Sequence, residues 1–144
     1  MPVGDRRDPY GSHNFLVEID GIVRGGFREC SGLDTSQDPI DYREGTDPPT
    51  MRRLHGLVKY TNVTLKWGMT DDTELWDWRL KAMEGKVERK NGSIVLLDDT
   101  GAEKLRWNFH AGWPSRWSGP TFNATGNEVA VETLEIVHEG IVRA

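Results

Sequence analysis

Hydrophobic and polar residues alternate along much of this chain in short runs with a period of two. In residues 14–21, Val17 and Ile19 fall on one side and Glu18 on the other, which predicts a half-buried strand. Residues 22–33 form a second such run, so the pair predicts a β-hairpin across the Asp-Gly turn at 20–21. The Gly-Gly pair at 25–26 indicates a bulge or a close backbone approach.

The middle of the chain contains two strand patterns separated by a proline-containing segment. Residues 39–45 alternate weakly and predict a third strand, whereas residues 46–56 (TDPPTMRRLHG) contain two prolines that oppose regular pairing. We therefore expect 46–56 to be an extended loop. Residues 59–68 then predict a clear strand, with Val63, Leu65 and Trp67 on one face.

One segment has the period of a helix. Within residues 69–85, Asp71 is a candidate N-cap with Glu74 three residues later, and Gly85 suits the position after the last turn. The spacing i, i+4, i+7 predicts that one apolar stripe is buried, formed by Trp76, Leu80 and Met83. We expect the helix at about residues 72–84.

The last third again predicts strands. Residues 86–101 predict two strands joined at the Asn-Gly turn 91–92, followed by a turn at 99–101. The stretch RWNFHAGWPSRWSGP (106–120) predicts a strand with Trp107 and Phe109 facing a core and corners at its two X-Pro steps. Residues 126–142 predict one long strand, whose apolar phase shifts through a bulge near Thr133 or because its ends face different layers.

Many strands, tight turns and one helix give a mainly β fold. We expect a small β-barrel or sandwich flanked by the helix at 72–84, in a single domain over residues 1–144. Residues 1–13 are polar and rich in Pro and Gly, which predicts an extended N-terminal arm.

Composition narrows the classes of function. Eighteen Lys and Arg against 23 Asp and Glu give a net charge of -5, whereas nucleic-acid binders usually carry a basic excess. We expect no membrane span and no signal peptide, because no long apolar run is present. The single cysteine, Cys30, predicts a buried small residue in a protein made in the cytosol.

The sequence contains no recognisable catalytic, cofactor-binding or metal-binding motif. The four histidines lack the spacing of a zinc site, and no phosphate-binding, dinucleotide or nucleophile-elbow motif occurs. We therefore predict no catalytic, cofactor-binding or metal-binding residue, and a protein that is not an enzyme. The tryptophans are predicted to be structural anchors, with a carbohydrate-binding β-module as a remote alternative: Trp76, Trp107, Trp113 and Trp117.

Together, several motifs resemble one family. The segments are DPY (8–10), FLVEIDG (15–21), GGFRECSGL (25–33), YREG (42–45), KYTNVTLKWG (59–68), RKNGSIVLLDDTG (89–101), RWNFHAGWPSRWSGP (106–120) and NEVAVETLEIVHEGI (127–141). In this order and spacing they resemble the inner tube proteins of contractile injection systems and the tail tube proteins of contractile-tailed phages, whose fold the secretion protein Hcp shares. His55 stands where the family usually has proline, and Trp67 where it usually has a basic residue.

The resemblance implies a structural subunit made and assembled in the bacterial cytoplasm. Six copies would close into a ring, and rings would stack head to tail into a tube that a contracting sheath drives through a target envelope. Implied partners are the sheath, the baseplate, tube-initiator proteins, a terminator cap, and an effector or DNA in the lumen, with no cofactor and no stable membrane association. Both injection system and phage tail remain open.

The resemblance also implies which segments touch neighbouring copies. These are the N-terminal arm and the 46–56 loop with its flanks. The expected contact residues are Asp8, Pro9, Tyr10, Tyr42, Arg43, Glu44, Asp47, Met51, Arg52, Arg53 and Leu54.

Overall fold

The computed structural model describes residues 11, 14–20, 22–24, 26–46, 48–126 and 128–144. Within them, one helix accompanies a set of mostly short strands. In chain order the elements are β1 (Phe15–Ile19), β2 (Ile22–Arg24), β3 (Phe27–Ser31), β4 (Thr35–Tyr42), β5 (Arg52–Tyr60), β6 (Val63–Gly68), α1 (Glu74–Met83), β7 (Lys90–Leu97), β8 (Glu103–Ser118), β9 (Val131–Val137) and β10 (Gly140–Arg143).

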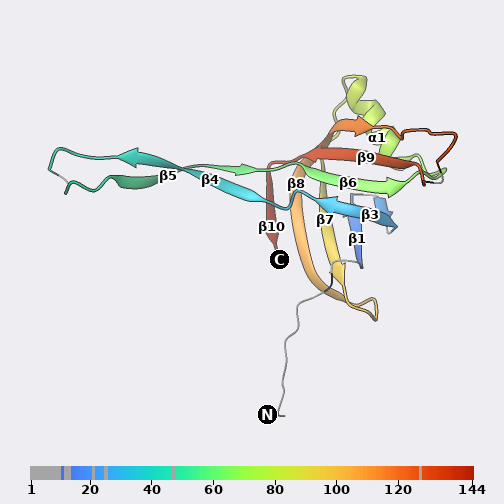
Figure 1. The fold of residues 1–144 in the computed structure, drawn as a ribbon, viewed down its shortest axis with the longest axis horizontal. Coiled ribbons are helices and arrows are strands. Elements are labelled where there is room, and N and C mark those ends of the chain that lie inside the picture. Colours follow the sequence, from blue (N-terminus) through green and yellow to red (C-terminus); the bar gives the residue numbers. More distant parts are fainter. Residues whose placement is uncertain (1–10, 12–13, 21, 25, 47, 127) are drawn as a thin grey trace, which may run out of the picture.

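Two sheet layers share the long strand β8. The strand order is β2-β1-β7-β8-β9-β6-β3, with β10 also paired to β8 (Figure 1). The first half of β8 lies between β7 and β10, and its second half pairs with β9. The sheet therefore folds over along β8 into a sandwich that does not close into a barrel. The predicted mainly β class with one helix is confirmed.

The fold-over occurs where β8 bends. Ala111 has φ 53°, and a Cβ on Gly112 would lie 2.6 Å from the Phe109 ring, so the bend needs a residue without a side chain. The strand that pairs with β8 is interrupted at the same level, where β9 ends and β10 begins. The ends of the predicted strand 126–142 thus lie in different layers, and the corner expected at Trp113-Pro114 was wrong, because both residues lie within β8.

The core lies between the two layers. Its members are apolar side chains from both sheets and from the helix: Val17, Ile19, Ile22, Ile94 and Phe109 from one, Val63, Leu65, Trp67, Leu134 and Ile136 from the other, and Leu75 and Trp78 from α1. The predicted inward residues of β1 and β6 are among them. Alternation in strands paired on both sides therefore identified the part of the core that β1 and β6 contribute.

The expected hairpin across 20–21 is confirmed by the antiparallel pairing of β1 and β2, whereas one predicted strand and one predicted turn differ in the structure. The expected strand 22–33 is divided into β2 and β3, which belong to different layers, and Gly26 between them has φ 77°. The expected hairpin at Asn91-Gly92 was wrong, because β7 continues through both residues, with a register shift against β8 between Lys90 and Gly92, and pairs with β1 and β8. Gly21 and Gly25 lie outside the described residues.

The helix is shorter than predicted and buries a different face. Its N-cap is Thr73, without a side-chain capping bond, so the Asp71 cap was wrong. Its end is as predicted: Gly85 has φ 83°, and the N–H groups of Gly85 and Lys86 donate to earlier carbonyl oxygens at 3.1 and 2.9 Å. Leu75 and Trp78 face the sandwich, whereas the expected stripe of Trp76, Leu80 and Met83 is exposed.

Two hydrogen bonds hold the helix in place. The Trp78 indole N–H donates to the carbonyl oxygen of Glu88 at 2.7 Å, and the Arg79 guanidinium donates to the carbonyl oxygen of Pro114 at 3.3 Å. These bonds fix α1 against β8 and against the segment that leads into β7. The helix is therefore attached by its Leu75 and Trp78 face at the end of the sandwich where β8 pairs with β9.

The strands β4 and β5 form a separate two-stranded hairpin. The loop expected at 46–56 was wrong in its second half, because β5 begins at Arg52 and pairs with β4 throughout. Pro48 and Pro49 lie in the turn between the strands, and Pro39 lies at a register shift. The prolines therefore sit where they interrupt the ladder least. The expected strand 59–68 is likewise divided into β5 and β6.

Candidate assembly surfaces

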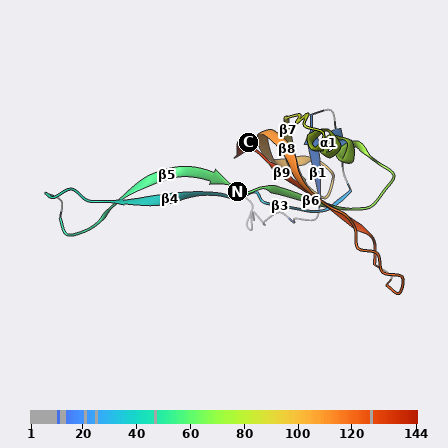
Figure 2. The ribbon, with the colours of Figure 1, turned by 90° about the horizontal axis from the view of Figure 1, so that it is seen from above.

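The β4–β5 hairpin extends away from the sandwich along the long axis of the molecule (Figures 1 and 2). Every residue of β4 is exposed, and every residue of β5 except the half-buried Gly56. Two strands alone are marginally stable in water, so such a ribbon needs a surface to pack on. The hairpin is therefore a candidate contact element.

The two faces of the hairpin differ in chemistry. Ile40 pairs opposite Leu54, and next to them Tyr42 pairs opposite Arg52, whose guanidinium carbon lies 5.7 Å from the Tyr42 ring centre. Directly opposed residues share a face, so these side chains form one surface. Asp41 and Arg53 pair on the other face, where they form an ion pair at 3.5 Å. At the outer end of the hairpin one face is thus mainly apolar and the other charged, whereas further in the Asp38–Lys59 ion pair lies on the side of Ile40.

The hairpin gathers most of the sequence-predicted contact residues at its outer end. Tyr42, Arg43, Glu44, Met51, Arg52, Arg53 and Leu54 all belong to this end. The Tyr42 hydroxyl donates to the Glu44 carboxylate at 2.6 Å, and Arg43 donates to the carbonyl oxygen of Pro48 at 3.2 Å, which orders the tip. Asp8, Pro9, Tyr10 and Asp47 lie outside the described residues.

Sequence reasoning missed the inner part of this surface. Leu57 and Val58 are exposed on β5 and lie between the expected loop 46–56 and the expected strand 59–68. The local sequence gives little signal here, because of the residues 52–60 only Val58 and Tyr60 belong to the types enriched in strands. The hairpin formed by β4 and β5 therefore extends beyond the predicted contact residues between Tyr42 and Leu54.

Aromatic rings form a connected row between the sandwich and the helix. Ring centres are 5.8 Å apart for Phe27 and Trp67, 5.3 Å for Trp67 and Trp117, and 5.2 Å for Trp117 and Trp76. Each contact is edge to face, which is a favourable geometry for packed aromatic pairs. The rings do not share a plane, so the row is unsuited to stacking on consecutive sugars. Trp117 packs within the subunit.

The other two predicted anchors lie on β8. Trp107 is half-buried opposite Ile94, and Trp113 is half-buried opposite Val137. The fully buried aromatic side chain of this strand is Phe109, which sequence analysis had grouped with Trp107. The three tryptophans of 106–120 thus belong to one bent strand rather than to a ligand platform.

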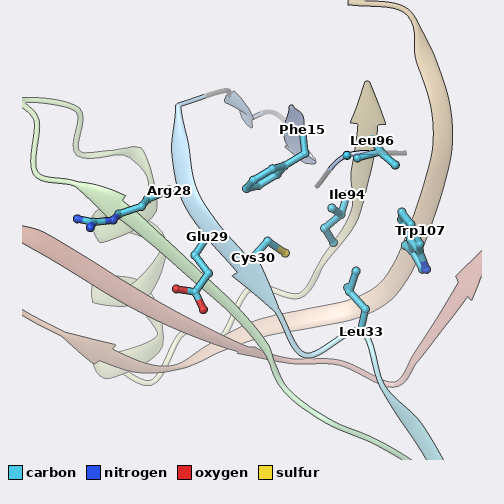
Figure 3. A pocket seen from close by; sticks show the side chains of 9 residues that line it. Phe15, Arg28, Glu29, Cys30, Leu33, Ile94, Leu96 and Trp107 are labelled. Atoms are coloured by element: carbon cyan, nitrogen blue, oxygen red, sulfur yellow. The ribbon is translucent and has the colours of Figure 1, made fainter. Parts of the chain in front are cut away.

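An apolar recess of about 360 Å³ opens between β3 and the sheet of β1, β7 and β8. Phe15, Cys30 and Ile94 point toward one another across it (Figure 3). Burial, with a smaller effect of Glu29, raises the pKa of the Cys30 thiol to about 12, which keeps it protonated and weakly nucleophilic. This cysteine is suited to packing rather than to catalysis.

Titratable groups elsewhere have structural partners. The Asp98 carboxylate accepts hydrogen bonds from Thr100 and Ala102, which lower its pKa to about 2 and close the turn between β7 and β8. The described residues contain no group of three or more His, Cys, Asp or Glu placed to hold a metal ion. Nor do they include a helix with the length and hydropathy needed to cross a bilayer.

Comparisons with known proteins agree with this geometry. A chain in the extended sheath–tube complex of PVC, an extracellular contractile injection system, is 30% identical, with a TM-score of 0.85 over 94% of this chain and 91% of that one. A chain in the PVC sheath/tube terminator structure is also 30% identical, with a TM-score of 0.86 over 96% and 98%. Hcp1 from Flavobacterium johnsoniae, at 19% identity and a TM-score of 0.55 over 90% and 93%, shares the fold.

No curated protein sequence is significantly similar to this chain. The family model of the T4-like virus tail tube protein gp19 matches residues 11–142, which include both sheet layers, the helix and the hairpin. With the sandwich, the projecting hairpin and these similarities in view, the chain belongs to the family of the T4-like virus tail tube protein gp19.

Proposed function

We propose that this chain is a structural subunit of the inner tube of a contractile injection system. The carrying observation is its membership of the tail tube family together with similarity, over nearly its whole length, to chains of a contractile injection particle. In this role copies close into six-membered rings, and rings stack head to tail into a rigid hollow tube. Residues 1–144 act as one tube domain.

The exposed hairpin supports this role physically. An unprotected two-stranded ribbon with apolar side chains favours aggregation unless a defined neighbour covers it. A tube provides such a neighbour for every copy. The arm at 8–10 and the tip residues from Tyr42 to Leu54, with Asp47, are accordingly the proposed contacts between copies.

The tube subunit performs no chemistry in this proposal. Its described residues offer contact surfaces and a rigid core, so it acts as a passive wall that a contracting sheath drives forward as a unit. Sheath, baseplate, tube-initiator and terminator cap proteins are its proposed partners, an effector is its proposed cargo, and assembly takes place in the bacterial cytoplasm.

A phage tail that conducts DNA is the second candidate. The family model is that of a virus tail tube protein, which favours this alternative. The wall would have the same architecture, and only the payload would differ. Isolation of the native particle separates the two: a DNA-filled capsid on the tail supports the phage, and a particle without a capsid supports the injection system.

Purified wild-type protein provides the first test of assembly. We expect gel filtration and negative-stain electron microscopy to show rings of about six copies or stacked tubes, as a closed cyclic interface requires. A protein that stays monomeric at high concentration would contradict the tube proposal.

The hairpin itself is tested by charge reversal. Replacing Arg52 and Arg53 with Glu should shorten or abolish tubes while changing the stability of the subunit little, because exposed charges contribute little to folding. The control pair is Lys104→Glu with Arg143→Glu, which are exposed on the sandwich. Tubes of unchanged length in the hairpin variant would refute the contact role of these arginines.

A further inference from the structure

The helix carries a second apolar surface that its own subunit covers only in part, through the contact of Trp76 with Trp117. Trp76, Leu80 and Met83 are 39%, 37% and 50% exposed, and their spacing places them on one side of α1. Beside Trp76, Met69 and Pro120 line a shallow groove. We call Trp76, Leu80 and Met83 the outer stripe. A contiguous exposed patch of large apolar side chains marks an interaction site.

The attachment of the helix described above involves only Trp76 of the outer stripe, through its contact with Trp117. Leu75 and Trp78 are 1% and 2% exposed and already pack α1 onto the sandwich. In a helix that packed on one side only, Leu80 and Met83 would be expected to be polar. Their apolar character therefore calls for a partner outside the subunit.

The hairpin offers a surface of matching chemistry. Ile40, Leu54 and Tyr42 form its apolar face and are all exposed. The charged side chain at the outer end of that face is Arg52, which lies over the Tyr42 ring, and further in Asp38 lies on the same face and pairs with Lys59 at 2.6 Å. On the helix, Asp77, Lys81 and Glu84 each directly follow a residue of the outer stripe and so border it, and Lys81 is paired with Glu88 at 3.3 Å. An arginine beside the apolar face and carboxylates beside the stripe are complementary.

The shape of the subunit decides which copy can make this contact. The hairpin projects from one end of the long axis, and α1 lies at the other end (Figures 1 and 2). A subunit cannot bring its hairpin to its own helix without dismantling the sandwich. A contact between opposite ends of two copies is heterologous, and it propagates into a ring or a filament.

We propose that the outer stripe of α1 is the docking surface for the β4–β5 hairpin of a second copy of this chain. The proposal rests on the tube function and adds the acceptor side of the contact. Ile40 and Leu54 of one copy pack against Leu80 and Met83 of the next, and Arg52 lies near Glu84. Each copy then both donates a hairpin and accepts one.

Apolar-to-charged substitutions test the acceptor. Leu80→Glu and Met83→Glu should each raise the protein concentration needed for rings or tubes by roughly tenfold or more, because a carboxylate would be buried without a partner. Both should retain the wild-type circular dichroism spectrum and thermal midpoint. The matched control is Val142→Glu, at a side chain that is 65% exposed on β10, away from the helix. Assembly of both helix variants at the wild-type concentration would overturn the proposal.

A charge exchange tests the pairing itself. Arg52→Glu should weaken assembly, and adding Glu84→Arg should restore it at least in part, whereas Glu84→Arg alone should weaken it. Restoration is an outcome that general damage to either surface would not produce. Failure of the exchange, together with unaffected assembly of the single variants, would overturn the contact.

Cross-linking tests proximity between copies. Protein with Leu54→Cys is mixed with protein carrying Leu80→Cys and oxidised; the native Cys30 has a pKa of about 12 and should react little. A disulfide dimer that forms in this mixture, and not with Val142→Cys in place of Leu80→Cys, supports the proposal. Wild-type tubes without the cross-link would overturn the docking site and leave the tube function intact. Absence of any wild-type assembly would instead overturn the tube function.

Discussion

The replacement of Gly92 by alanine tests the reason for the Asn-Gly sequence inside β7. An added Cβ would lie 2.6 Å from Cε2 of Phe109 and 2.9 Å from the carbonyl oxygen of Glu18. Real Cβ atoms do not approach so closely, so the Phe109 ring or the β1 backbone must move. The backbone of Gly92 does not have a positive φ, so its conformation suits alanine.

Steric overlap thus sets the expected cost. Overpacking of a tight core costs about 1–3 kcal/mol, and we expect about 2 kcal/mol here because one contact is with backbone. For a chain of this length that corresponds to a fall of about 6–8 °C in thermal midpoint. The control is Gly119→Ala, where an added Cβ meets nothing within 4 Å and the change should stay within about 0.5 kcal/mol.

Urea unfolding of dilute protein, followed by tryptophan fluorescence, measures both variants. The decisive comparison adds Phe109→Leu, which removes ring atoms at the point of overlap. In the double variant the cost of Gly92→Ala should shrink by about 1 kcal/mol or more, a coupling expected only for side chains in contact. If Gly92→Ala were as neutral as Gly119→Ala, or its cost were independent of Phe109, the steric reasoning would be refuted.

Two further predictions concern titratable groups. His138 accepts the Gly140 N–H at Nδ1 (3.2 Å) and donates from Nε2 to the Thr61 carbonyl oxygen (3.0 Å), and burial lowers its pKa below 6.5. As pH falls, His138 therefore takes up a proton in the unfolded chain before it does so in the folded protein, so the unfolding free energy should fall as pH drops below 6.5. Urea unfolding from pH 7.5 to 5.0 measures this change. An equally steep fall in the His138→Gln variant would contradict it. Cys30, with a pKa of about 12, should react with an aromatic disulfide at pH 8 more than about a hundredfold slower than in urea; equal rates would show that the recess is open.

Sequence periodicity predicted most of the secondary structure where one face of a strand is buried. The alternation around Val17 and around Leu65 correctly gave β1 and β6 and their inward side chains. The glycine at 85 correctly gave the end of the helix, because only a residue that tolerates positive φ suits that position. These signals are local, and the backbone itself supplies their physical cause.

Predictions from local sequence were wrong where a contact with a distant segment determines the role of a residue. Gly92 was interpreted as a turn residue, although its missing side chain makes room for Phe109, which is 17 positions away. The stripe of Trp76, Leu80 and Met83 satisfied the helical period as well as Leu75 and Trp78 did, and only the position of β8 selects which face is buried. Periodicity identifies an apolar face without identifying what covers it.

The sequence alone therefore determined the mainly β class, the single helix, the core side chains of β1 and β6 and, through its motifs, the tail tube resemblance. The tertiary structure decided that β8 bends from one layer to the other, that residues 35–60 form an exposed hairpin, and that the hairpin and the outer stripe lie at opposite ends. Alternation and turn preferences act between near neighbours. Strand order, the bend at Ala111 and the direction of the hairpin depend on contacts between residues far apart in the chain.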